Sequence, residues 1–117
     1  MIVHITVHTA KLKETVEFYQ WLLGLPISRN FSTPMGEIIF LGEGETKFEL
    51  IEDNKAEKVN AKGLSIGFAV ESLEQKLALL AGREIGHSQI ISPSPNVRFA
   101  FFTDLNGCVI QLCEEKK

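Results

Sequence analysis

The chain of 117 residues has little cysteine, no long apolar run and no excess of basic residues, and each absence excludes a class of protein. Its two cysteines, Cys108 and Cys113, are five positions apart on one expected strand. Their side chains therefore point to opposite faces and cannot form a mutual disulfide. The CxxC spacing of a zinc site is also absent, so we expect both thiols to be reduced, buried and inert.

The balance of charge argues against nucleic acid or an anionic membrane as a partner. The chain has 12 basic and 15 acidic residues, a net charge of −3, and its Lys and Arg residues are scattered rather than gathered into a stripe. The apolar runs are too short to span a membrane, and Met1 leads directly into a strand-like segment without the pattern of a signal peptide. We therefore expect a cytoplasmic protein with no nucleic-acid and no membrane partner.

What the sequence does contain is the composition of one globular domain, 44% hydrophobic and 23% charged. Residues 2–8 alternate between apolar and polar side chains, which predicts a strand. Residues 12–23 are apolar at spacings of three and four and are followed by Gly24, which predicts a helix. Three short β-prone runs follow, separated by turn residues, at 27–31, 37–41 and 47–51.

The second half of the chain repeats this order. It predicts a strand at 64–70, a helix at 73–81 opened by the capping pair Ser72 and Gln75, and strands at 88–91, 97–103 and 108–114. When the sequence is aligned with itself at an offset of 61 residues, Leu12 falls on Leu73, which indicates an internal duplication. Residues 53–62 are polar and read as a linker. The fold class is therefore α+β, a single domain of two βαβββ modules at 1–52 and 63–115.

Each module should have one sheet face covered by its own helix and one left bare. Two such faces, in one chain or across a dimer, must combine, and we expect the sheets to curl around a pocket. Strand parity identifies the residues that face it. They are His4, Thr6 and His8, then Ser65, Gly67 and Ala69, and from the last strands Glu49, Ile51, Val109, Gln111 and Cys113.

Five segments carry a resemblance to a known family: His4-Ile5-Thr6-Val7, Glu17-Phe18-Tyr19, Leu22-Leu23-Gly24-Leu25, Phe102-Thr103-Asp104-Leu105-Asn106-Gly107 and Val109-Ile110-Gln111-Leu112. The chain resembles the vicinal oxygen chelate superfamily, which includes glyoxalase I, bleomycin-resistance proteins, fosfomycin-resistance enzymes and extradiol dioxygenases. In metal-dependent relatives, four inward positions hold a divalent ion. The resemblance places these positions at His4, Glu49, Ser65 and Gln111.

Two of these four positions depart from the pattern. Ser65 stands where His is usual, and Gln111 stands where Glu is usual; a hydroxyl and an amide are poorer ligands than an imidazole and a carboxylate. The resemblance therefore implies a metal site of His4, Glu49 and Gln111 that holds either no ion or a weakly bound divalent one. The ligand-binding set that we expect is His4, Thr6, His8, Ser65, Gly67 and Gln111.

Glu49 is the candidate catalytic residue. A carboxylate between Phe48 and Leu50 is costly to bury unless it is paired, protonated or bound to metal. It could act as a general base or could only hydrogen-bond His4, and His4 is equally well a ligand or a histidine of the pocket wall. His87 is expected in a surface loop.

The sequence is compatible with three functions. The first is a homodimer that sequesters a small molecule, as bleomycin-resistance proteins do; the alternative is a metal-dependent lyase, isomerase or dioxygenase acting on a substrate with vicinal oxygens. A scaffold that uses the fold only to dimerise is the third. Four aromatic residues could stack against a planar ligand, although such residues more often fill cores: Trp21, Phe31, Phe99 and Phe101.

Overall fold

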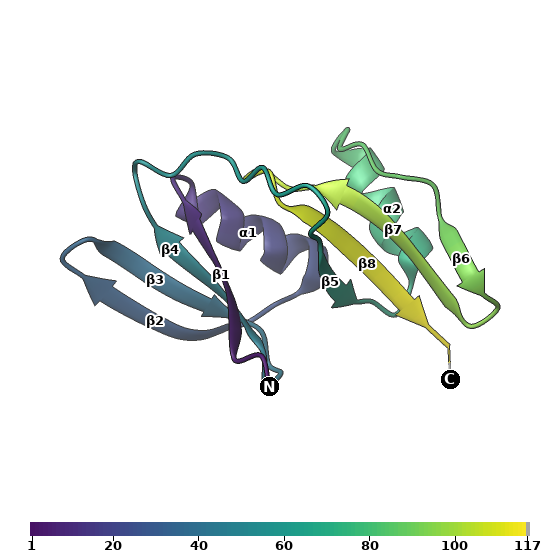
Figure 1. Cartoon of the computed structure of the whole chain (residues 1–117), viewed down its shortest axis with the longest axis horizontal. Coiled ribbons are helices and arrows are strands. Elements are labelled where there is room, and N and C mark those ends of the chain that lie inside the picture. The colour runs from purple at the N-terminus through teal and green to yellow at the C-terminus, as the bar shows by residue number, and fades with distance from the viewer. Residues whose placement is uncertain (117) are drawn as a thin grey trace. The chain divides into compact units, whose positions relative to one another are not determined.

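A computed structural model describes residues 1–116. The chain divides into two compact units (Figure 1), of which the first runs from Met1 to Lys58 and the second starts at Val59. Within residues 1–116, no helix has the length and apolar character of a membrane span.

The first unit is a four-stranded sheet with one helix. Its elements are β1 (His4–Thr9), α1 (Leu12–Leu23), β2 (Ile27–Thr33), β3 (Gly36–Leu41) and β4 (Lys47–Glu52). The strand order is β1-β4-β3-β2, with β1 parallel to β4 and the other pairs antiparallel. Helix α1 lies along one face (Figure 1), where Tyr19 is fully buried and its ring packs edge-on at 5.0 Å from Phe48. Gly24 ends the helix in the left-handed conformation that favours glycine.

The second unit repeats this arrangement. Its elements are β5 (Ile66–Ala69), α2 (Leu73–Gly82), β6 (Ile91–Ser94), β7 (Val97–Thr103) and β8 (Val109–Glu115), and the strand order is β5-β8-β7-β6. The predicted cap of α2 is confirmed, because the Ser72 hydroxyl accepts a hydrogen bond from the Gln75 N–H at 3.3 Å. Leu73, Leu77 and Leu80 of α2 are buried. The α+β class and the two βαβββ modules are thus confirmed.

One predicted strand is wrong in position. We expected a strand at 88–91 and the next strand at 97–103, but β6 runs from Ile91 to Ser94 and includes Pro93. The strand lies at the edge of its sheet, pairing only with β7, and a proline is tolerated on an edge strand because its missing N–H need not join a ladder. Ser88 still contacts β7, since its N–H donates to the Phe101 carbonyl at 2.8 Å.

Burial alternates along the central strands of each sheet. In β4, Phe48 and Leu50 are buried on the helix side, whereas Glu49 and Ile51 are only half-buried. In β8, Ile110 and Leu112 are buried and Gln111 is half-buried. Each buried side chain of this size contributes about 1.5–3 kcal/mol, so the helix-covered faces carry the core. The opposite faces, which we call the open faces, present the residues predicted to meet a ligand.

Candidate functional site

The open face of the first unit carries a compact polar cluster. Thr6 and Glu49 are direct partners in the parallel ladder of β1 and β4, and the Thr6 hydroxyl donates to Glu49 Oε1 at 2.5 Å. His4 Nε2 lies 3.4 Å from the same oxygen. The Glu49 side chain is 12% exposed, whereas the His4 side chain is 42% exposed. Three residues predicted from strand parity therefore meet at one carboxylate.

This cluster can receive a donor from a ligand. Within residues 1–116, no donor bonds the other Glu49 oxygen, Oε2, and no hydrogen bond engages His4 Nδ1. A carboxylate accepts several hydrogen bonds, and a neutral imidazole both donates and accepts. Thr6 fixes the carboxylate in place, so Oε2 is a positioned acceptor for a hydroxyl or amine.

Phe40 completes the surroundings of this cluster, although sequence reasoning did not single it out. It pairs with Glu49 across β3 and β4, and its ring lies edge-on at 5.9 Å from the His4 ring. Parity within one strand could not identify it, because the face on which Phe40 lies depends on the register of β3 against β4.

His8 belongs to a separate pair at the end of β1. Its Nδ1 lies 3.3 Å from Asp53 Oδ2, and the His8 side chain is 57% exposed. The Asp53 carboxylate accepts a hydrogen bond from the Lys55 N–H at 2.9 Å, and this bond, followed by the contact with His8, lowers the pKa of Asp53. His8 therefore shares a face with His4 but contacts a different carboxylate.

The second unit carries a different set at the related positions. Gly67 pairs with Gln111 as Thr6 pairs with Glu49, and Ser65 is exposed just before β5. A Cβ atom on Gly67 would lie 3.2 Å from Gln111 Oε1, so the amide lies close to the Gly67 backbone. Gly67 has no hydroxyl to donate to Gln111, in contrast to Thr6, which donates to Glu49. Phe101 lies across from Gln111 on β7, which puts this ring, and not Arg98, on the open face.

The two cysteines lie in this unit as free thiols. Burial raises the pKa of the Cys108 thiol to about 11 and also raises the pKa of Cys113. A raised pKa disfavours the thiolate, which is the reactive form. Cys108 is buried as expected, whereas Cys113 is only half-buried, so the expectation that both thiols are buried is wrong for Cys113.

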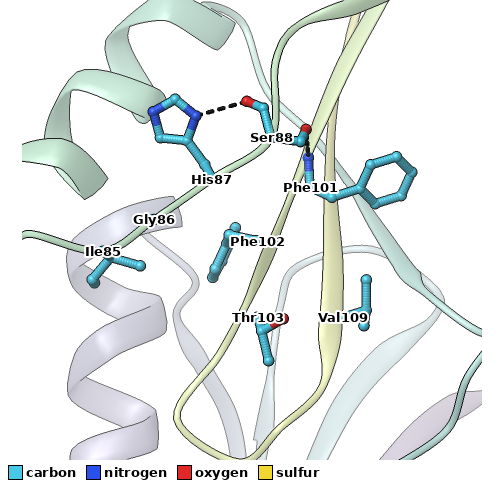
Figure 2. A pocket seen from close by; sticks show the side chains of 8 residues that line it. All are labelled: Ile85, Gly86, His87, Ser88, Phe101, Phe102, Thr103 and Val109. Atoms are coloured by element: carbon cyan, nitrogen blue, oxygen red, sulfur yellow. Dashed lines mark hydrogen bonds between the residues drawn. The ribbon is translucent and has the colours of Figure 1, made fainter.

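The second unit also has a shallow depression of about 450 Å³ beside β7 (Figure 2). His87, which we expected on the surface, lines it, but its Nδ1 donates to the Ser88 carbonyl at 2.8 Å. The Ser88 hydroxyl accepts from the Phe101 N–H and donates to the Gln89 carbonyl. His87 Nδ1 and the Ser88 hydroxyl are thus engaged in hydrogen bonds within the second unit.

Comparison with known proteins identifies the family. The model of the Glyoxalase/Bleomycin resistance protein/Dioxygenase superfamily matches residues 1–112. The chain belongs to this superfamily. No curated protein matches the chain.

Three solved structures share the fold of this chain. A glyoxalase family protein from Enterococcus faecalis is 23% identical, with a TM-score of 0.75 and 97% of each chain covered. The trypanothione-dependent glyoxalase I of Leishmania major is 22% identical, with a TM-score of 0.81, covering 98% of this chain and 86% of that one. An antibiotic-binding protein from Streptomyces sp. CB03234 is 15% identical, with a TM-score of 0.74, covering 99% and 96%.

The residues at the superfamily's metal positions do not fit a firmly held ion. Among residues 1–116 there is no group of three His, Cys, Asp or Glu side chains that could hold one. The first unit supplies two good ligands, His4 and Glu49, and Thr6 already occupies one carboxylate oxygen. The second unit supplies an amide and a hydroxyl, and divalent ions favour several firm ligands.

Proposed function

We propose that this superfamily member binds a small molecule on the open face of the first unit, at His4, Thr6 and Glu49, and sequesters it without chemical conversion. The supporting observation is the Glu49 carboxylate, which is 12% exposed, anchored on one oxygen by Thr6 and open on the other. A largely buried carboxylate is stabilised when a ligand donates a hydrogen bond to an oxygen that has no partner.

The cluster also has the parts of a general base, because His4 lies 3.4 Å from Glu49. A metal-dependent lyase, isomerase or dioxygenase would use these same two residues as ligands. The weak donors Gln111 and Ser65 favour the sequestering function over this alternative.

Elemental analysis of protein purified without chelator separates the two functions. We expect substoichiometric metal in the parent, even after incubation with nickel, zinc, manganese and iron salts. Near-stoichiometric metal that is lost in both His4→Ala and Glu49→Ala would replace the sequestering function with the metal-dependent enzyme.

Ligand binding itself is tested by a thermal-shift screen of small molecules. A ligand that binds only the folded state raises the melting temperature, and the rise grows with the ratio of ligand concentration to dissociation constant. Compounds that stabilise the parent should lose this effect in Glu49→Ala and keep it in His87→Ala, which alters a histidine of the second unit. Equal loss of the shift in both variants, or retention in both, contradicts the proposed site.

We also propose that the protein acts as a homodimer. In the part of the chain that the structure describes, Ile91 is 44% exposed on the open face of the second unit, and large exposed apolar side chains mark interaction surfaces. Sedimentation velocity should give twice the mass of the chain, and Ile91→Glu should shift the population toward monomer. A parent that sediments as a monomer at all concentrations excludes the dimer.

A further inference from the structure

A row of side chains crosses the open face of the first unit and extends the polar cluster. Arg29 and Phe31 come from β2, Phe40 from β3, and Glu49 and His4 from β4 and β1. In the ladder, Arg29 pairs with Phe40 and Phe40 pairs with Glu49. These five residues form what we call the cross-sheet row.

The middle of the row is aromatic. The Phe31 and Phe40 rings are edge-on at 6.1 Å, and the Phe40 and His4 rings are edge-on at 5.9 Å. Phe31 lies on the edge strand β2 and is 41% exposed, which is unusual for a large apolar side chain. Arg29 lies over one face of the Phe31 ring, so the opposite face of that ring is the one that can stack against a planar ligand.

One end of the row is a cation without a counterion. The Arg29 guanidinium lies 4.7 Å from the Phe31 ring centroid and 5.9 Å from that of Phe40. In the described part of the chain, no carboxylate pairs with it, whereas Arg98 of the second unit pairs with both Glu74 and Glu114. Contact with the two rings positions the guanidinium, and its N–H groups can donate to an anion.

The other end of the row is an acceptor. Glu49 Oε2 receives no hydrogen bond from residues 1–116, and Thr6 fixes the carboxylate. Glu49 and Arg29 are two strands apart, which corresponds to about 10 Å across a sheet. The row therefore presents a cation, an aromatic surface and a hydrogen-bond acceptor in that order.

We propose that the cross-sheet row selects a planar conjugated anion that carries a hydroxyl or amine at the end opposite its acid group. Arg29 binds the acid, Phe31 and Phe40 contact the flat part, and Glu49 accepts from the hydroxyl or amine. This inference deepens the proposed function and rests on it, because it takes the same open face as the binding surface.

Three related fluorescent probes test each part of this assignment. 6-Hydroxy-2-naphthoate has both groups at opposite ends of two fused rings, 2-naphthol lacks the acid, and 2-naphthoate lacks the hydroxyl. We expect the parent to bind 6-hydroxy-2-naphthoate most tightly. Removal of a charge-assisted contact in Arg29→Gln should weaken that binding about tenfold and leave 2-naphthol binding unchanged.

Variants assign the other contacts. Glu49→Gln replaces a charged acceptor with a neutral amide and should reduce the preference for 6-hydroxy-2-naphthoate over 2-naphthoate, and Phe31→Ala should weaken the binding of all three probes. Arg83→Gln is the matched control, since it removes a guanidinium from the second unit. Circular dichroism melts of each variant report whether the fold is kept, and Arg29 is exposed, so its replacement should not unfold the protein.

The possible results separate this inference from the proposed function. If Glu49→Gln weakens probe binding but Arg29→Gln behaves as Arg83→Gln does, the proposed function stands and the selection for an anion is overturned. If the probes bind and no variant of the row changes binding, the selection for a planar anion by the row is overturned. If the parent binds none of them at millimolar concentration, the ligand class is overturned, and the thermal-shift screen decides the proposed function separately.

Discussion

At the scale of single residues, Glu114 joins three elements of the second unit. Its buried carboxylate accepts a hydrogen bond from the Leu73 N–H at 2.8 Å, at the start of α2, and from Arg98 Nε of β7 at 3.2 Å. An acceptor at a helix N-terminus satisfies an N–H that has no partner within the helix. Its counterpart by the duplication, Glu52, accepts instead from the Glu37 N–H.

We predict that this carboxylate makes stability dependent on acid pH. The bond from Leu73, followed by that from Arg98, lowers the pKa of Glu114 below its ordinary value of 4.5. A pKa that is lower in the folded state contributes stability that is present above the unfolded pKa and is lost as the pH falls through the folded pKa. Glu114→Gln should therefore lower the melting temperature at pH 7, and the difference from the parent should shrink below pH 4.5.

Thermal melts between pH 7 and pH 2.5 measure this difference. Glu115→Gln is the control, because Glu115 is the exposed neighbour on the same strand. A difference between parent and Glu114→Gln that is the same at every pH contradicts the prediction.

Gly36 lies at a backbone position where a residue with a side chain would be strained. Its φ is +135°, and a Cβ atom there would lie 2.9 Å from Glu52 Oε1 and 3.3 Å from the Glu52 backbone oxygen. We predict that Gly36→Ala lowers the free energy of unfolding by about 1–3 kcal/mol, because both strain and a close backbone contact oppose a side chain. Urea titration measures it, and Gly44→Ala, which meets no atom within 4 Å, should change stability much less.

At the scale of elements, the two helices begin differently. Ser72 caps α2 through its side chain, whereas Lys11 precedes α1 without a side-chain cap. This contrast follows from the sequence, since serine accepts a hydrogen bond from the first turn and lysine cannot.

We predict that Ser72→Ala destabilises the protein by about 1 kcal/mol, because one N–H of the first turn of α2 loses its acceptor. Chemical denaturation of parent and variant measures the change. Ser72→Asp keeps an acceptor at this position and should retain most of the stability; an equal loss in both variants would show that the cap is not the cause.

At the scale of the whole molecule, the two units are joined by a segment without helix or strand. Residues 53–65 belong to no regular element, and Lys55, Lys58 and Lys62 are exposed there. Irregular exposed backbone fits a protease active site more readily than hydrogen-bonded helices and strands do.

We predict that limited trypsin digestion cuts first in this segment and yields two fragments of about half the chain. Lys13 provides an internal control, because it is equally exposed but lies within α1. Mass spectrometry of the first products identifies the cut, and early cleavage after Lys13 would contradict the prediction.

The sequence alone determined the fold class, the duplication and the polarity of each strand face. These follow from periodicity, because a strand alternates its faces at every residue and a helix repeats its apolar residues at spacings of three and four. His4, Thr6 and Glu49 were identifiable in this way, since their parity opposes that of buried neighbours such as Val7 and Leu50.

Only the tertiary structure decided which of these residues touch. Thr6 and Glu49 are separated by 43 positions, and Arg29 meets Phe40 only through the bulged register of β2 against β3. Register is set by packing and turn geometry across the sheet, not by the pattern within one strand. The position of β6 was predicted wrongly for the same reason. An edge strand pairs on one side only and tolerates a proline, so the prolines in the sequence do not show where the strand begins.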